Sequence, residues 1–169
     1  MKKRAALLPA LLLPALLLTA GCGLQPVYSG GTASPVAQGL AQVDVAPIEG
    51  RAGWLVRNAL VDRMSIAKSS SAPVYRLDVR LDDRLEALGV LSNDEISRER
   101  RTLRARYQLV DIASGEIVFD STAASDAGID VVSSEYATIA AEQTALENLS
   151  RDIADRIVSA LAQRIQATS

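Results

Sequence analysis

A stripe of aliphatic residues through the last third of the chain places the strongest limit on its fold. The spacing of the stripe is near 3.6 residues, which predicts one helix from about Ser133 to Gln166. Either Ser133 or Ser134 can cap it. At about 1.5 Å per residue it approaches 50 Å, so we expect it to kink or run past the strands it covers. The stripe consists of Ile139, Leu146, Leu149, Ile153, Ile157, Leu161 and Ile165.

Upstream of that helix, apolar and charged residues alternate in the manner of half-buried strands. The clearest run is 74–82, which the pattern extends to about Glu86, and similar patterns cover Leu103–Val110 and about 116–123. Short links between these runs predict an antiparallel meander. A further short strand is expected within 40–47, and an amphipathic helix within 54–67.

The expected order is therefore β-α-β-β-β-α. Each strand shows one apolar face and each helix shows one apolar stripe, so both helices should cover the same face of the sheet. This predicts an α+β two-layer sandwich, a four-stranded mainly antiparallel sheet with two helices on one face. The folded domain is expected to span residues 40–169.

The N-terminus has the features of an exported lipoprotein. Three basic residues precede an uncharged run from Ala5 to Ala20 that prolines interrupt, followed by Gly21 and Cys22. This pattern indicates a signal peptide over 1–21 and acylation of Cys22. A free thiol in a soluble secreted protein is the alternative. Because Gly23 stands where Asp commonly retains lipoproteins at the inner membrane, the outer membrane is favoured.

Between the anchor and the domain, residues 22–39 are rich in Gly, Ser, Pro, Thr and Ala. Such a composition buries little and predicts a flexible tether. Without residues 1–21 the chain keeps 15 basic against 20 acidic residues, a net charge of −5. That charge disfavours general binding to nucleic acid.

Composition also limits the chemistry. The sequence contains no histidine and a single cysteine, so the usual zinc ligands and the Ser-His and Cys-His pairs are missing. We expect no metal, no cofactor and no enzymatic activity. Catalysis by two carboxylates, as in a cell-wall hydrolase, is the remaining enzymatic alternative.

One basic cluster stands out from the acidic chain. Guanidinium groups bind phosphate in a bidentate manner, so the cluster is a candidate site for lipopolysaccharide or another anion. Arg104 and Arg106 should share the face that points away from the core. For these two, cross-strand ion pairs with Asp78, Asp82 and Asp83 are an equal alternative. The cluster consists of Arg98, Arg100, Arg101, Arg104 and Arg106.

Two aromatic residues lie near the expected helix starts. For Tyr136, packing between the last helix and the sheet is favoured over a role in binding. Trp54 is given no functional role, because an interface and the edge of the core suit it equally.

Several segments in this order resemble the LptE family of lipopolysaccharide-assembly lipoproteins. They are 22–28 (CGLQPVY), the arginine-rich strand ending in 107–111 (YQLVD) with Gly115 after it, and 134–137 (SEYA) at the start of the long helix. The resemblance covers essentially the whole mature chain. No individual binding residue of the family aligns with a unique position here.

The resemblance implies an outer-membrane lipoprotein that plugs the β-barrel of the lipopolysaccharide translocon, an LptD-like protein. It also implies that the chain assists assembly of that barrel and binds lipopolysaccharide. The alternative function is an auxiliary periplasmic lipoprotein of an ABC-type phospholipid or solvent export system, which would share the tether and the α+β domain.

Overall fold

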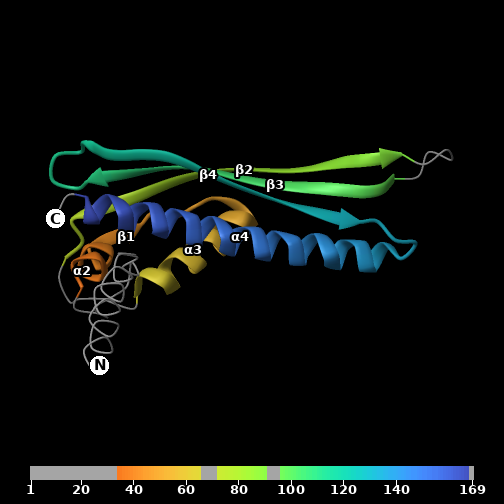
Figure 1. Ribbon diagram of the computed structural model, residues 1–169, viewed down its shortest axis with the longest axis horizontal. Coiled ribbons are helices and arrows are strands. Elements are labelled where there is room, and N and C mark those ends of the chain that lie inside the picture. Colours follow the sequence, from red (N-terminus) through yellow and green to blue (C-terminus); the bar gives the residue numbers. More distant parts are fainter. Residues whose placement is uncertain (1–33, 66–71, 91–95, 168–169) are drawn as a thin grey trace, which may run out of the picture.

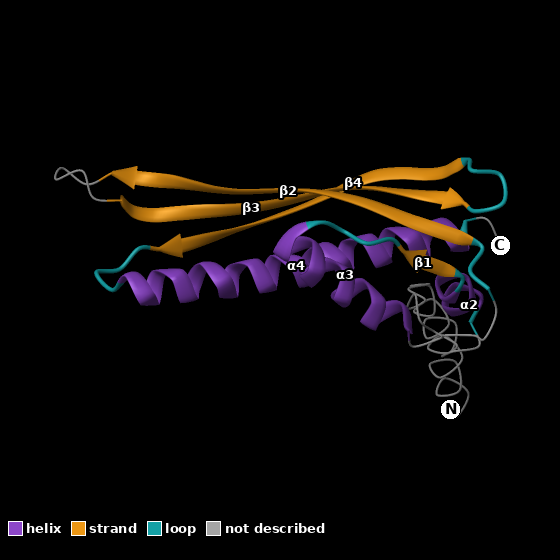
Figure 2. Cartoon of the chain, turned by 180° about the vertical axis from the view of Figure 1, so that it is seen from behind, coloured by secondary structure: helices purple, strands orange, loops and turns teal. Residues whose placement is uncertain are grey.

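The chain folds into a sheet with helices on one face (Figures 1 and 2). The computed structural model describes residues 34–65, 72–90 and 96–167. The signal peptide, Cys22 and the tether as far as residue 33 lie outside these residues. The elements are α2 (Pro35–Ala41), β1 (Val43–Val45), α3 (Gly50–Met64), β2 (Tyr75–Val90), β3 (Ile96–Asp111), β4 (Ile117–Asp130) and α4 (Glu135–Gln166).

The predicted fold class is confirmed. The strands lie in the order β1-β2-β3-β4. β1 pairs with β2 in parallel, and the other two pairings are antiparallel. No helix in the described part of the chain is long and apolar enough to cross a membrane.

The strands are longer than their sequence patterns indicated. β2 and β3 each have 16 residues and β4 has 14, so at about 3.3 Å per residue the sheet extends for about 50 Å. α4 has 32 residues and a similar length. The expectation that this helix outruns its strands was therefore wrong. Ser134 caps α4 by accepting a hydrogen bond from the Ala137 amide, as the sequence indicated.

The core lies between the sheet and the C-terminal part of α4. Ile153, Ile157 and Leu161 of α4 are fully buried. Tyr107 of β3 is buried on the same side, and its ring meets Phe119 edge-on with 6.0 Å between centroids. The alternation of apolar and charged residues along β3 therefore directs Tyr107 to the helix side.

A short helix replaces the last part of the expected tether. Ser34 caps α2 by accepting a hydrogen bond from the Ala37 amide at 3.1 Å, and Pro35 occupies the first turn. Val36 and Leu40 are buried. The prediction of a flexible segment up to residue 39 was wrong at its C-terminal end, because two apolar residues four positions apart suffice to dock one helical turn onto the core.

α3 begins four residues before the expected position. Gly50, with φ 78°, turns the chain into the helix. At Gly53 a Cβ would lie 2.6 Å from the Ile48 carbonyl oxygen, so the close approach requires glycine. Trp54 projects outward and is 63% exposed.

The molecule has two halves of different construction. We call "the covered half" the part where α2, α3 and β1 add to the layer formed by α4, and "the arm" the part where only α4 accompanies the sheet (Figure 1). The arm comprises 84–90, 96–102, 126–130 and 135–144.

Candidate binding face of the sheet

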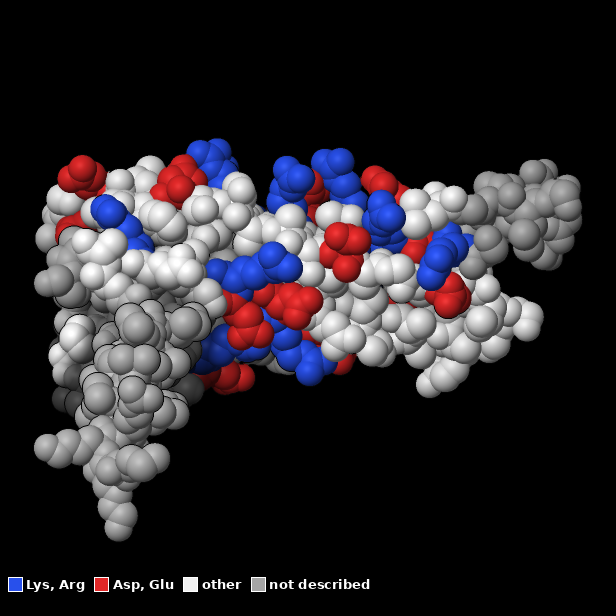
Figure 3. Space-filling model, in the orientation of Figure 1, with Lys and Arg blue, Asp and Glu red and all other residues white. Residues whose placement is uncertain are grey.

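The face of the sheet that points away from the helices is rich in charged side chains. Even-numbered residues of β2, β3 and β4 occupy it, opposite in parity to buried Leu77 and Leu103. Basic and acidic groups mix along the sheet in Figure 3. The basic members are Arg76, Arg80, Arg84, Arg98, Arg100, Arg104 and Arg106, and the acidic members are Asp78, Asp82, Glu86, Asp120, Asp126 and Asp130.

Three of the predicted site residues are paired with acids of β4. Arg98 contacts Asp130 at 3.2 Å, Arg100 contacts Asp126 at 4.0 Å, and Arg106 contacts Asp120 at 2.8 Å. The ion-pair alternative that the sequence offered for Arg106 placed its acidic partner on the preceding strand, among Asp78, Asp82 and Asp83. The partner instead lies on β4, because that long strand brings its own acids alongside β3.

The pair formed by Arg106 and Asp120 is the best-formed of the three. Arg106 donates from both Nε and Nη2, at 3.2 and 2.8 Å, and Gln108 donates to the same carboxylate at 2.8 Å. Hydrogen bonding from Arg106, then from Gln108, lowers the pKa of Asp120. The carboxylate therefore stays ionised at neutral pH and balances the charge of Arg106.

Arg101 lies on the opposite face from the other members of the predicted cluster. Its Nη2 is 2.7 Å from Asp83, and its Nη1 donates to the Glu142 carbonyl at 3.1 Å. The hydrogen bond to Asp83 raises the pKa of Arg101. Its odd number, like that of Leu103 and Ala105, already indicated an inward direction. Arg101 joins the arm's sheet to α4 and does not contribute to the outer face.

Arg104 differs from its neighbours. It is exposed, and it forms no ion pair or side-chain hydrogen bond with any other residue that the structure describes. Arg80 of β2 is likewise exposed and without such a contact among the described residues. It lies directly opposite Arg106, and Arg104 is the neighbouring outward-facing residue of β3. Sequence reasoning missed Arg80, although its alternation with Asp78 and Asp82 placed it on this face.

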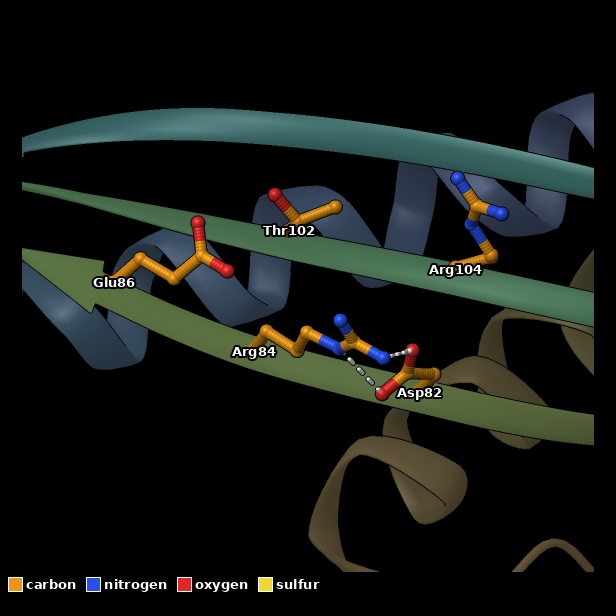
Figure 4. Close-up of a pocket in the computed structure, with 5 residues that line it drawn as sticks. All are labelled: Asp82, Arg84, Glu86, Thr102 and Arg104. Atoms are coloured by element: carbon orange, nitrogen blue, oxygen red, sulfur yellow. Dashed lines mark hydrogen bonds and ion pairs between the residues drawn. The ribbon is translucent and has the colours of Figure 1, made fainter.

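A shallow groove of about 230 Å³ opens beside Arg104. Arg84 holds Asp82 through two contacts, of 3.1 and 2.9 Å. Figure 4 shows this pair together with Arg104, Thr102 and Glu86, none of which has a partner drawn. The groove therefore offers a guanidinium for an anion, with a hydroxyl and a carboxylate nearby for hydroxyl or amine groups.

Tyr136 does not pack between helix and sheet. It is 83% exposed at the start of α4, so the favoured packing interpretation was wrong. Across the described ranges, no group of three or more Asp, Glu, His or Cys residues is arranged to hold a metal ion.

Comparison with known proteins gives the same architecture. A candidate lipoprotein of Caulobacter crescentus CB15 superposes with a TM-score of 0.64 at 25% identity, covering 80% of this chain and 98% of that one. Rare lipoprotein B of Shewanella oneidensis gives a TM-score of 0.56 at 13% identity, covering 72% and 92%. A minor lipoprotein of Acinetobacter baumannii gives 0.57 at 13%, covering 73% and 92%.

Fold and surface together define a helix-backed sheet domain, and the solved structures that share this architecture are lipoproteins. The sequence model of the LptE lipopolysaccharide-assembly family matches residues 40–161. The chain belongs to that family, which consists of accessory lipoproteins rather than enzymes. No curated protein matches the sequence.

Proposed function

We propose that this chain is an outer-membrane lipoprotein that plugs the β-barrel of the lipopolysaccharide translocon, assists its assembly and binds lipopolysaccharide. Family membership supports the role in lipopolysaccharide assembly. We add to that role a barrel partner, a location in the outer membrane and the binding of lipopolysaccharide.

The chain that follows Cys22 joins the domain at α2, at the end of the covered half. Cys22 precedes the cap residue Ser34 by 12 residues, a reach of about 40 Å at about 3.3 Å per residue. α2 packs against the C-terminal end of α4, where Gly39 meets Ile165. Acyl chains on Cys22 would therefore hold the molecule by the end remote from the arm (Figure 1), and several chains would make that attachment effectively permanent.

The single observation that carries lipopolysaccharide binding is the pair of unpartnered arginines, Arg80 and Arg104. Every other arginine on the outer face has a carboxylate within 4.0 Å. An incoming phosphate would need to displace those carboxylates, whereas Arg80 and Arg104 offer their donors directly. Phosphate groups on a lipid headgroup match this arrangement.

Affinity purification of the lipidated chain from native membranes tests the proposal. We expect one large β-barrel protein in near-equal amount, identified by mass spectrometry. Recovery of an ABC transporter in place of a barrel would contradict the proposal and favour an export accessory. Release of sugars from peptidoglycan by the purified chain would contradict it in favour of a hydrolase.

A further inference from the structure

The end of the covered half carries aliphatic side chains that the core leaves exposed. Ile112 and Ile117 stand on the two sides of the turn between β3 and β4, and each is 49% exposed. Val74, which precedes β2, is 41% exposed. The Ile112 amide donates to the Val74 carbonyl at 3.0 Å, and Ile117 pairs in register with Val110 near the end of β3. We call Val74, Ile112 and Ile117 "the end patch".

The turn that holds the end patch outward is ordered by its own hydrogen bonds. The Asp111 carboxylate accepts from the amides of Ala113 and Ser114, each at 2.9 Å. The Gly115 amide donates to the Asp111 carbonyl at 2.8 Å, and Gly115 has φ 72°, a conformation that favours glycine. Because these backbone amides have acceptors within the turn, it can lie against an apolar surface without leaving them unpaired.

The end patch adjoins the place where the chain from Cys22 joins the domain. The Val74 amide donates to the carbonyl of Gln42, the C-cap of α2, at 2.9 Å. In both ribbon views the turn between β3 and β4, α2 and the C-terminus lie at the same end of the molecule (Figures 1 and 2). Ser34 follows Cys22 by 12 residues, so acyl chains on Cys22 would keep Ser34 within about 40 Å of the membrane.

The position of the anchor favours a membrane surface as the occupant of the end patch. The arm also exposes apolar side chains, among them Tyr136 and Ile139, but it lies at the opposite end of the molecule (Figure 1). Anchoring through a short linker raises the effective concentration of the end patch at the membrane, so a weak contact suffices. Residues 111–117 include two acidic residues and no basic one, so the contact would be hydrophobic rather than an attraction to anionic lipid.

We propose that the end patch of the anchored chain, before it meets its barrel, rests in the headgroup layer of the membrane that holds the acyl chains of Cys22. This inference rests on the proposed function for the acyl anchor. Several acyl chains already make the attachment effectively permanent, so the contact adds orientation rather than affinity. It leaves the arm, at the other end of the molecule, clear of the membrane surface and available to a partner.

Spin labelling of the full lipidated chain in vesicles tests the contact. Acylation occupies the only cysteine of the sequence, so Ala113→Cys in the turn, or Ala124→Cys opposite Arg104 on β4, gives a single site for a nitroxide. The vesicles contain phosphatidylethanolamine and phosphatidylcholine and no barrel. The same labels on a soluble chain with Cys22→Ala give the collision rates without a membrane.

We expect the vesicles to protect position 113 from a water-soluble nickel chelate. Its collision rate should fall by at least about threefold relative to the soluble chain, as for a side chain at headgroup depth, whereas the rate at position 124 should stay unchanged. Adding phosphatidylglycerol to the vesicles should not increase the protection, because the contact is hydrophobic.

The outcomes separate the two proposals. Equal collision rates at the two positions, in a chain that sediments with the vesicles, would overturn the membrane contact and leave the proposed function intact. A mass spectrum without acyl chains on Cys22 would overturn the anchor in the proposed function and, with it, this contact. Protection of position 113 only after addition of lipopolysaccharide, or only in the complex with the barrel, would assign the end patch to that partner and overturn the membrane contact.

A matched pair of double variants gives an independent test. Ile112→Ser with Ile117→Ser removes the apolar surface of the end patch, and Tyr136→Ser with Ile139→Ser removes exposed apolar surface from the arm. We expect the first variant to lose the protection of position 113 and the second to keep it. Equal protection in both variants would overturn the proposal, and circular dichroism checks that both variants fold.

Discussion

The covered half and the arm use the same strands and the same helix but differ in what surrounds them. In the covered half, α4 residues such as Ile157 and Leu161 are fully buried among three helices and the sheet. In the arm, α4 presents Tyr136 and Ile139 to solvent, and β2 presents Leu85. Stability should therefore be concentrated in one half, while the other half keeps surface available for partners.

The polar contacts follow the same division. Arg63 of α3 donates to Asp155 of α4 and so joins two helices inside the covered half. In the arm, as far as the structure describes the chain, Arg101 alone connects the inner face of the sheet to the α4 backbone. The remaining arginines of the arm lie on the outer face, where solvent screens their ion pairs and each contributes little to stability.

The largest expected difference between the halves comes from truncating one aliphatic side chain in each. Ile157→Ala removes a fully buried side chain, so we expect the free energy of unfolding to fall by about 2–5 kcal/mol. Leu85→Ala should change it by no more than about 0.5 kcal/mol. Urea unfolding at constant m-value measures both, and equal losses would show that the arm is as well packed as the covered half.

Two glycines give a second, smaller contrast. Gly53→Ala places a Cβ against the Ile48 carbonyl, so we expect a loss of about 1–2 kcal/mol despite the better helix propensity of alanine. At Gly128 in the arm the nearest atom to a Cβ is Arg98 Nε, at 3.8 Å. Gly128→Ala should therefore stay within about 0.5 kcal/mol of the parent. Thermal unfolding compares them, and a neutral Gly53→Ala would contradict the close approach.

The smallest effect is a dependence on pH that belongs to the covered half. The hydrogen bond from Arg63 lowers the pKa of Asp155 below its ordinary value of 3.8. Because the folded-state pKa is the lower one, the stabilisation is present above pH 3.8 and disappears as the pH falls through the folded value. Asp155 is 62% exposed, so the contribution should stay below about 1 kcal/mol.

Unfolding of the parent and of Asp155→Asn between neutral and strongly acidic pH measures this contribution. The parent should be the more stable of the two at neutral pH, and the two curves should converge in acid. A difference that grows as the pH falls would reverse the expected sign. Arg63→Ala should behave like Asp155→Asn, because it removes the same pair.

The covered half was the easier part to predict from sequence. The alternation in 74–82 and the stripe in α4 record burial directly, so the fold class followed from the pattern. α2 was missed because Gly, Ser and Pro dominate its surroundings, although Ser34 and Pro35 form an ordinary helix start.

The arm was harder for a physical reason. Residues 124–130 contain alanine, glycine and aspartate, which favour strands weakly on their own, and only the ladder with β3 holds them in β4. The candidate site was predicted in part. Arg104 and Arg106 point outward as expected, whereas the pairing of Arg98, Arg100 and Arg106 depends on the position of β4, which the sequence pattern did not contain.

The outer face of the sheet as a lipopolysaccharide-binding surface is the central claim, and two double variants of equal charge test it. Arg80→Ala with Arg104→Ala removes the unpartnered arginines, and Arg76→Ala with Arg98→Ala removes two that are held by Asp78 and Asp130. Titration of the full chain with purified lipopolysaccharide at fixed salt gives the affinities. We expect about tenfold weaker binding for the first variant, corresponding to the loss of a charged hydrogen bond, and less than about twofold for the second. Equal losses, or no loss in the first, would contradict the claim.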